Sequence, residues 1–487
     1  MTLRLTLAFT LIATSAFADV TYIERALPDH VYAGGWEHFV GGGVAAFDCN
    51  GDQLPELYAA GGENPAQLMR NVTSGAGGDL TFVSNTPDVS NTPDALALTG
   101  VIGAYPLDID GDSILDLAIL RSGTDILMQG QGDCDFAPFT DLGFESGTHW
   151  TTAFSATWEA GNTLPTLAFG TYVDRSNPDG PFEACDATLL YRPNGQSYGP
   201  AERLDPGFCA LSMLFTDWSR SGRADLRVSN DRHYYVRGGQ EQMWAMEEAP
   251  RLFSQDDGWQ PYMLWGMGIA SRDLNGDGFS DVYLTSMADQ KFQYFDPAAG
   301  GPWYRDVTYE RGTTAHRPYT GGDGRPSTGW HAAFGDVNND GLDDIFVAKG
   351  NVEQMPGAAM DDPNNLLIQS ADGTFSERGL EAGIANLARS RGAALMDLNL
   401  DGKLDLAVVN RRAQMDLYQN TSAQGNWLGV QLNSPASNTQ SVGAHVELRI
   451  GDRVQTREIT VGGGHAGGQA GAIHFGMGQE TIAEIRV

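Results

Sequence analysis

The chain has 487 residues, including 61 glycines, and its 62 acidic residues outnumber 30 basic ones, for a formal net charge of -32. This charge makes nucleic acid or an anionic membrane a poor partner. Abundant Gly, Asp and Asn, with no long periodic run of helix-forming residues, favour an all-β protein of short strands and tight turns.

The first eighteen residues, MTLRLTLAFTLIATSAFA, place one arginine before an apolar run and end in Ala16-Phe17-Ala18. This pattern predicts a signal peptide (1–18) cleaved after Ala18. No later apolar stretch reaches the roughly 18 residues that a membrane span needs, so we expect a secreted or periplasmic protein without membrane insertion.

An oxidising compartment also suits the four cysteines of the chain, Cys49, Cys134, Cys185 and Cys209. We expect one or two disulfides among them. Cys185 with Cys209 is the first candidate pair, because these two residues lie close in sequence.

A nine-residue acidic pattern recurs along the chain. It reads DCNGDQLPE at 48–56, DIDGDSILD at 108–116, DLNGDGFSD at 273–281, DVNNDGLDD at 336–344 and DLNLDGKLD at 397–405. Each copy lies between two short apolar runs, such as GGVAAF and LYAAGG around the first. The pattern therefore predicts a strand, an acidic turn and a second strand in each copy.

Two degenerate copies fill the long gap in this series. DWSRSGRAD at 217–225 keeps both end carboxylates, whereas WEAGNTLPT at 158–166 retains only the off-register Glu159. First positions then fall at 48, 108, 158, 217, 273, 336 and 397, which makes seven units. Such a period, with several strands in each unit, indicates a propeller or a solenoid.

The ends of the repeat region favour the propeller. DVTYIER at 19–25 resembles DVTYER at 306–311, which falls where a unit has its outer strand, and the last unit stops after MDLYQN at 415–420. We expect the N-terminal strand to complete the last unit, which closes the ring and leaves no unpaired edge. The prediction is a seven-bladed β-propeller over 19–423 and a small β-rich domain over 424–487.

The acidic residues in each intact copy have the spacing of a cation-binding loop. Side-chain oxygens stand at positions one, three, five and nine, and position seven offers its carbonyl, which suits calcium with its six to eight oxygen ligands. An EF-hand differs, because its closing Glu is at position twelve and helices flank it. The alternative is a set of Asp/Asn-rich turns without metal; five copies in register favour the metal.

The predicted cofactor is therefore calcium, about five ions with a mainly structural role. The expected ligands are Asp48, Asn50, Asp52, Glu56, Asp108, Asp110, Asp112, Asp116, Asp273, Asn275, Asp277, Asp281, Asp336, Asn338, Asp340, Asp344, Asp397, Asn399, Asp401 and Asp405. Each loop is named here by its first residue. Loops 48 and 108 depart from the pattern, because Gln53 and Ser113 replace the glycine found at position six in the other three. Loop 217 is a doubtful site, and loop 158 is expected to bind no ion.

These loops, with trailing phrases such as LLIQSADGTFSERGLEAGI at 366–384, resemble FG-GAP/VCBS repeats of calcium-loop propellers. NWLGVQLNSPASNTQSVGAHVELRIGDRVQTREITVGGG at 426–464, with IHFGMG at 473–478, resembles the ASPIC/UnbV domain. The combination is similar to the cartilage acidic protein-like family. Because that family usually continues through a further strand, the resemblance implies an incomplete last domain.

Conspicuous side chains precede several of the inner strands, at the end opposite the acidic loops. Besides His38, they are His149, Trp150, Trp265, Trp330, His331, Arg389 and Arg391. Around the mouth of a central channel they could stack on a sugar or bind an acidic group. The alternative, packing between neighbouring blades, is favoured by their large aromatic area.

The remaining motifs give no chemistry. There is no P-loop and no paired-histidine metal motif, and no catalytic residue is assigned. The glycines of GGGHAGGQAGAIHFGMG, beside His465 and His474, indicate turns or a flexible loop.

The leading hypothesis is a secreted, calcium-stabilised binding or adhesion protein for a protein or glycan partner. The alternative is a polysaccharide-active lyase or hydrolase at the channel mouth, with His331 or His149 as base and Arg389 or Arg391 holding a uronate.

Overall fold

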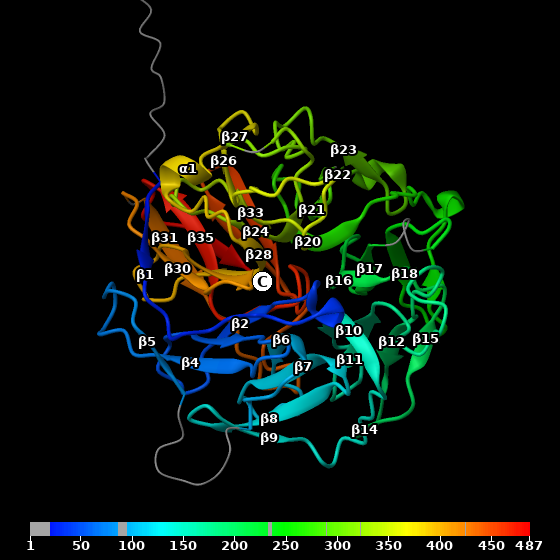
Figure 1. Ribbon diagram of the computed structural model, residues 1–487. Coiled ribbons are helices and arrows are strands. Elements are labelled where there is room, and N and C mark those ends of the chain that lie inside the picture. The colour runs from blue at the N-terminus through cyan, green and yellow to red at the C-terminus, as the bar shows by residue number, and fades with distance from the viewer. Residues whose placement is uncertain (1–19, 86–94, 232–235, 289, 322, 424) are drawn as a thin grey trace, which may run out of the picture.

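A computed structural model describes residues 20–85, 95–231, 236–288, 290–321, 323–423 and 425–487 (Figure 1). The predicted signal peptide lies outside these residues. The described chain is all-β apart from short helical segments: α1 (Gly379–Ala382), η1 (Trp36–His38), η2 (Gln255–Asp257) and η3 (Pro297–Ala299). None of the described helices is long and apolar enough to cross a bilayer.

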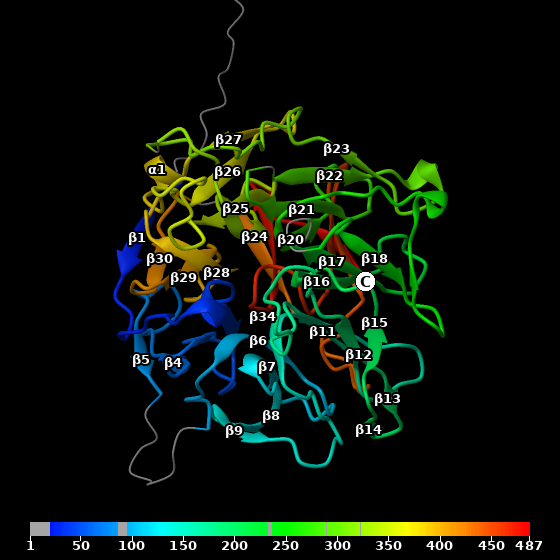
Figure 2. The same ribbon diagram turned by 45° about the vertical axis from the view of Figure 1, so that its right-hand side comes forward.

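Antiparallel sheets follow one another around a common centre, in a propeller-like arrangement (Figures 1 and 2). Each expected acidic turn joins an inner strand to a second strand. The inner strands are β2 (Val44–Phe47), β6 (Val101–Leu107), β10 (His149–Thr157), β16 (Ala210–Thr216), β20 (Gly266–Arg272), β24 (Gly329–Gly335) and β28 (Arg389–Met396). The second strands are β3 (Glu56–Ala59), β7 (Asp116–Gly123), β11 (Thr166–Thr171), β17 (Asp225–Asn230), β21 (Asp281–Ser286), β25 (Asp344–Lys349) and β29 (Asp405–Arg411).

Two further strands extend each sheet outward. The third strands are β4 (Gln67–Asn71), β8 (Ile126–Gly132), β12 (Thr188–Tyr191), β18 (Gln242–Ala245), β22 (Lys291–Phe295), β26 (Asn365–Gln369) and β30 (Asp416–Asn420). The outer strands are β5 (Phe82–Ser84), β9 (Asp135–Pro138), β15 (Glu202–Leu204), β19 (Arg251–Leu252), β23 (Tyr304–Asp306), β27 (Phe375–Glu377) and β1 (Tyr22–Arg25). A two-stranded hairpin, β13 (Pro193–Asn194) and β14 (Ser197–Tyr198), lies beside them.

The N-terminal strand β1 completes the last sheet. It pairs antiparallel with β30, with Tyr22 opposite Asn420 and Arg25 opposite Leu417. The Tyr22 hydroxyl also donates to the carbonyl of Leu404, at 3.0 Å. The strand exchange expected from the sequence is therefore present.

The inner strands are buried along almost their whole length. β2 (VAAF) and β6 (VIGAYPL) are buried at every residue. They read as continuous small and apolar runs instead of alternating, because neighbouring sheets pack on both of their faces. The hydrophobic core accordingly lies in layers between adjacent sheets.

Two disulfides cross-link the ring. Cys185 bonds to Cys209, which confirms the expected pair, and Cys49 bonds to Cys134 across 85 residues of sequence. The second bond joins the loop after β2 to the turn between β8 and β9 of the next sheet. Such bonds fit an extracellular protein.

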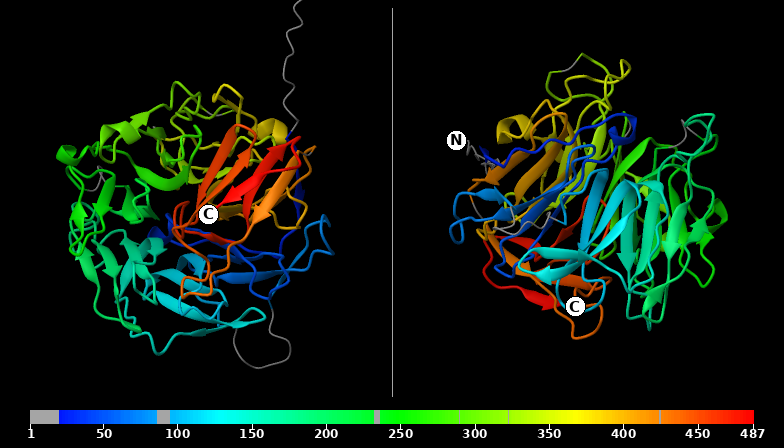
Figure 3. Two further views of the ribbon diagram at one scale, coloured as in Figure 1. Left: turned by 180° about the vertical axis from the view of Figure 1, so that it is seen from behind. Right: turned by 60° about the horizontal axis from the view of Figure 1, so that its bottom comes forward.

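Residues 425–487, here called the C-terminal module, form two small sheets over one end of the ring (Figure 3). β31 (Asn426–Val430) pairs with β35 (Ile473–Gly478), and β32 (His445–Ile450) pairs with both β33 (Arg453–Glu458) and β36 (Glu484–Arg486). The module has its own core, made of Val446, Leu448, Ile450, Phe475 and Met477. One short strand, β34 (Gln469–Ala470), leaves the module and pairs in parallel with β2.

Candidate functional site

The first carboxylate of each acidic loop is wrapped by backbone N–H groups of the same loop. The Asp273 carboxylate accepts from Gly276 N at 2.8 Å and from Gly278 N at 2.9 Å. The Asp108 carboxylate does the same with Gly111 N and Ser113 N, both at 2.8 Å. Position one therefore organises the turn, as short acidic side chains commonly do.

This wrapping requires left-handed backbone at position six. Gly278, Gly341 and Gly402 have φ of 87°, 88° and 78° there. Gln53 and Ser113 adopt nearly the same conformation, with φ of 72° and 73°. The two departures noted in the sequence thus keep the geometry of the loop while carrying a strained non-glycine residue.

The closing acid at position nine fastens each loop to the third strand of its sheet. One oxygen of Asp405 accepts from Leu398 N at 2.9 Å, and the other from Asn420 N at 2.8 Å. Asp281 brackets Leu274 N and Phe295 N in the same way. Both carboxylates are buried, and burial is the main cause that raises their pKa well above its usual value.

Carboxylates converge most closely in loop 108. Asp108, Asp110 and Asp116 each offer an oxygen, and these oxygens lie within 4.8 Å of one another. Burial, with the nearby charges of Asp110 and Asp108, raises the pKa of Asp116 to about 8. A hard cation would relieve this repulsion, and a carboxylate oxygen that accepts one hydrogen bond keeps a lone pair for it. The donor set therefore fits calcium.

Comparison of loop 217 with the intact loops shows which positions of the pattern are sufficient to form the turn. Asp217 is wrapped by Ser221 N at 2.8 Å and Gly222 N at 2.7 Å, as in the intact loops. Ser219 and Ser221 stand where those loops carry Asn or Asp. The turn therefore forms without acidic residues at positions three and five.

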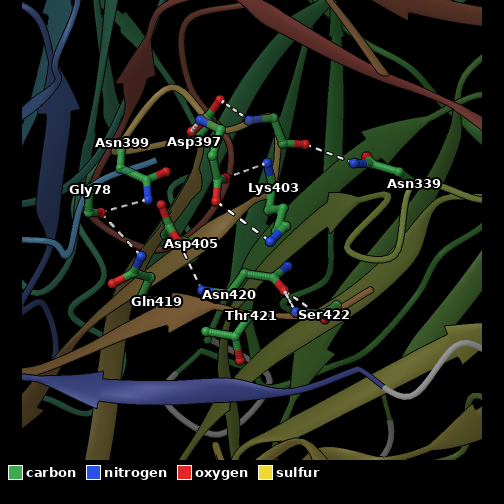
Figure 4. Close-up of polar contacts among 12 residues, drawn as sticks. Gly78, Asn339, Asp397, Asn399, Lys403, Asp405, Gln419, Asn420, Thr421 and Ser422 are labelled. Carbon is green, nitrogen blue, oxygen red and sulfur yellow. Dashed lines mark hydrogen bonds and ion pairs between the residues drawn. The ribbon is translucent and has the colours of Figure 1, made fainter. Parts of the chain in front are cut away.

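The loop at 397 shows the intact arrangement (Figure 4). Asp401 accepts from Lys403 N at 3.0 Å, and its other oxygen lies 3.7 Å from the Lys403 ammonium. The Asn399 amide donates to Gly78 O at 3.0 Å, in the neighbouring sheet. This loop consequently also links two sheets.

Two buried asparagines staple neighbouring loops together, a role that the sequence analysis missed. Asn420 donates to Leu404 O of its own loop at 3.2 Å and to Val337 O of loop 336 at 2.8 Å. Asn71 occupies the equivalent place between loops 48 and 397. Both asparagines begin an Asn-x-Ser/Thr triplet, whose hydroxyl bonds the amide oxygen at 2.6 Å. That triplet at the end of a third strand is the signal that could have revealed them.

The C-terminal module is seated on the acidic-loop end of the ring. Gln440 accepts from Asp108 N at 2.9 Å, and Glu458 accepts from Asp217 N at 2.7 Å. Arg457 forms a buried ion pair with Asp343, at 2.8 Å. The module thus contacts loops in separate sheets and covers this end of the ring (Figure 3).

The glycine-rich stretch 461–470, here called the central plug, fills the middle of the ring. Its backbone or side chains bond to every inner strand. The partners are Ala46 (to Gly468 O), Ala104 (to Ala466 O), Ala156 (to Val461 O), Met213 (from Gly463 N), Ile269 (from Gly464 N), His331 (from His465 N) and Leu395 (to the Gln469 side chain). The expectation of a turn or flexible loop is therefore wrong, because the glycines let the backbone approach the strands closely.

The predicted channel-mouth residues are largely part of the core. Trp150, Trp330 and Arg391 are buried, and His331 accepts a hydrogen bond from the plug. The Arg391 guanidinium lies 3.9 Å from the centre of the Trp330 ring and donates to carbonyls of Phe39, Ser390, Asn351 and Val352. As ligand-binding residues at the channel mouth, Trp150, Trp330 and Arg391 are a wrong prediction, because they are buried. Packing between sheets and against the plug uses their surfaces instead.

The other predicted mouth residues remain partly exposed. His149, Trp265 and Arg389 have intermediate exposure. His149 Nδ1 lies 3.0 Å from an Asp186 oxygen, and this hydrogen bond raises the pKa of the imidazole. Trp36, on η1, is 53% exposed and stacks on Phe39 with a centroid separation of 4.7 Å.

Comparison with known proteins identifies the family of the C-terminal module. Residues 434–487 match the sequence family described as ASPIC and UnbV, so the chain carries an ASPIC/UnbV domain. It is also related to cartilage acidic protein 1. The Homo sapiens protein is 29% identical over 171 residues, and the Mus musculus protein is 28% identical over 187 residues. These matches cover 33% and 36% of this chain but only 23% and 26% of the relatives.

Solved structures resemble the ring more distantly. BBS1N, solved in complex with ARL6DN, has a TM-score of 0.45 at 9% identity, covering 82% of this chain and 97% of its own. An Agrocybe aegerita lectin that recognises non-reducing terminal N-acetylglucosamine has a TM-score of 0.40 at 14% identity, covering 78% and 93%. No function is carried over at these scores.

Proposed function

We propose that this protein is an exported, calcium-stabilised, seven-bladed β-propeller that serves as a binding module for a protein or glycan partner. The observation that carries the calcium part is the set of loops in which positions one, six and nine make the turn. Side chains at positions three and five also accept backbone N–H groups, as Asp277 does from Phe279 N at 2.9 Å, but their oxygens keep lone pairs for an ion. Loop 217, which folds alike without them, supports this division.

The seven-bladed ring is supported by the strand order. Each of the seven units predicted from the sequence has an inner, second, third and outer strand, and β1 supplies the outer strand of the last one. Closing the ring in this way protects edges that would otherwise pair with other chains. The calcium ions pin the hairpins at one end, and their role is structural.

The contact surface that we propose lies at the end of the ring opposite the acidic loops. Trp36 offers an exposed aromatic face there, braced by Phe39 and, edge to face at 5.9 Å, by Trp150. His149, Trp265 and Arg389 add partly exposed polar and aromatic groups. A rigid aromatic ring beside hydrogen-bonding groups suits a sugar ring or a peptide side chain.

The calcium proposal is tested by thermal unfolding with calcium and with EGTA. We expect a lower Tm in EGTA, because each site held at about twenty times its Kd adds about 1.8 kcal/mol. Asp277→Asn should keep the oxygen that accepts from Phe279 N but lose the negative charge. It should therefore reduce the increase in Tm that calcium causes, and leave the Tm in EGTA nearly unchanged. Asp296→Asn, at the N-cap of η3, is the matched control. Equal Tm values with and without calcium for the wild type would refute the proposal.

The binding proposal is tested on a glycan array and with candidate extracellular matrix proteins. Trp36→Ala should lose the signal while folding normally. Trp427→Ala, which removes a 39% exposed tryptophan on the C-terminal module, should keep it. Unchanged binding by Trp36→Ala would place the contact elsewhere.

A further inference from the structure

A cavity of about 170 Å³ remains between the central plug and the inner strands β20 and β24. It is lined on one side by residues 269–272 and 331–334, and on the other by plug residues including Gly463 and Gly464. The cavity is large enough for several water molecules or for one small solute. Its walls are mostly backbone and small side chains, so the few functional groups on them define its chemistry.

Two strong hydrogen-bond donors line this cavity. Arg272 is protonated at any physiological pH, and its guanidinium makes one long hydrogen bond, to Phe334 O at 3.4 Å. His331 accepts the N–H of His465 on Nδ1 at 3.0 Å, and burial lowers its pKa to about 4. The neutral ring therefore carries its hydrogen on Nε2 and is a donor there.

Among the described residues, no carboxylate forms an ion pair with these donors, although Asp343 lies near enough to Arg272 to favour its charged form. None of the residues that line the cavity is acidic. Among the described residues, Arg272 has no acidic oxygen within ion-pair distance, whereas nearby Arg457 is already paired with Asp343 at 2.8 Å. This is unusual in a chain of net charge -32.

We propose that the cavity binds a small oxyanion of the size of a carboxylate or sulfate group. The guanidinium of Arg272 would supply charge and paired donors, and His331 would supply a neutral one. An unpaired cationic group at the edge of the core costs stability, so an anion here would stabilise the folded state. Because the plug forms one wall, the bound anion would also strengthen the contact between the ring and the C-terminal module.

The proposal is tested by measuring thermal unfolding in saturating calcium while sodium sulfate or sodium acetate is added. Sodium chloride at the same ionic strength is the control. Wild type should gain Tm with the oxyanion beyond the chloride control. Arg272→Gln should lose this gain, with at least about a tenfold weaker apparent affinity. Arg317→Gln, which removes an exposed arginine, should behave like the wild type.

A crystal soaked in selenate gives an independent reading, with an anomalous peak expected beside Arg272. Equal oxyanion responses in wild type and Arg272→Gln, or a cavity that holds only water in the soaked crystal, would overturn the proposal. Because calcium is saturating throughout, failure here leaves the calcium proposal untouched.

Discussion

The residue at position six of each acidic loop has a left-handed backbone conformation, and its identity determines the conformational strain in the loop. Position six is glycine in three intact loops, but Gln53 and Ser113 hold the same conformation with exposed side chains. A left-handed non-glycine residue costs roughly 1 to 2 kcal/mol. Loops 48 and 108 therefore carry local strain that the others avoid.

Gln53→Gly and Ser113→Gly should each stabilise the protein by about 1 kcal/mol, because they remove this strain. Denaturant unfolding measures the gain. Gly278→Ala makes the reverse change at φ 87° and should cost a similar amount. A loss of stability on either glycine substitution would mean that the native side chain makes a contact worth more than the strain.

The stapling asparagines act at the same scale. Asn420→Ala should destabilise the protein by about 2 kcal/mol, since it leaves the buried carbonyl of Val337 without the Asn420 donor, whereas Leu404 O keeps the Tyr22 hydroxyl. Chemical denaturation of Asn420→Ala against Thr421→Ala, an exposed neighbour on the same strand end, checks this. A cost below about 0.5 kcal/mol, typical of a surface site, would contradict the staple.

At the scale of elements, the central plug packs closely against the inner strands because glycines on or beside those strands have no side chain at the contact. A Cβ at Gly103 would lie 1.7 Å from the Ala466 carbonyl oxygen, and one at Gly43 would lie 1.8 Å from it. Neither glycine is required by its own backbone conformation, since neither has positive φ. The space beside both glycines is occupied by the plug.

Gly103→Ala should therefore displace the plug and cost at least about 2 kcal/mol, as overpacking does. Limited proteolysis of the C-terminal module, together with the unfolding midpoint, would detect it. The matched control is Gly199→Ala, where a Cβ meets no atom within 4 Å. If both variants were equally protected from protease, the plug would not depend on this contact.

At the scale of the whole molecule, the plug makes stability depend on pH. His465 is fully buried, accepts Gly41 N on Nε2 and bonds Met267 O through Nδ1. Burial lowers its pKa to about 3, whereas the unfolded chain takes up a proton near pH 6.5. The unfolded state thus binds more protons below pH 6.5, so this residue's contribution falls as pH drops from 6.5 towards 3.

The expected loss is about 1.4 kcal/mol per pH unit below 6.5. His465→Gln, which does not titrate, should lose less stability than wild type between pH 7 and pH 5. An NMR titration tests the same point without a variant. An imidazole of His465 that protonates near pH 6 in the folded protein would contradict the prediction.

Local chemistry explains what could be predicted from the sequence. Asp273, Gly278 and Asp281 make their turn by contacts within a few residues, so the acidic pattern located the loops, and apolar runs located the strands beside them. The plug could not be found in this way. Gly464 and Ala466 meet partners more than a hundred residues away, and glycine carries no chemical signal of its own. Trp330 and Arg391 are wrongly predicted to bind a ligand because their side chains are conspicuous in the sequence. Their long-range partners, which place them in the core, cannot be read from it.

The strands that line the centre have consequences for the order of folding. Tyr22 pairs with Asn420, and Ala46 donates to Gly468. Contacts that join positions about four hundred residues apart form slowly, because a long loop must close first. Until residues 461–470 arrive, backbone groups of every inner strand face an unfilled hole. We therefore expect the ring to form before residues 461–470 enter its centre.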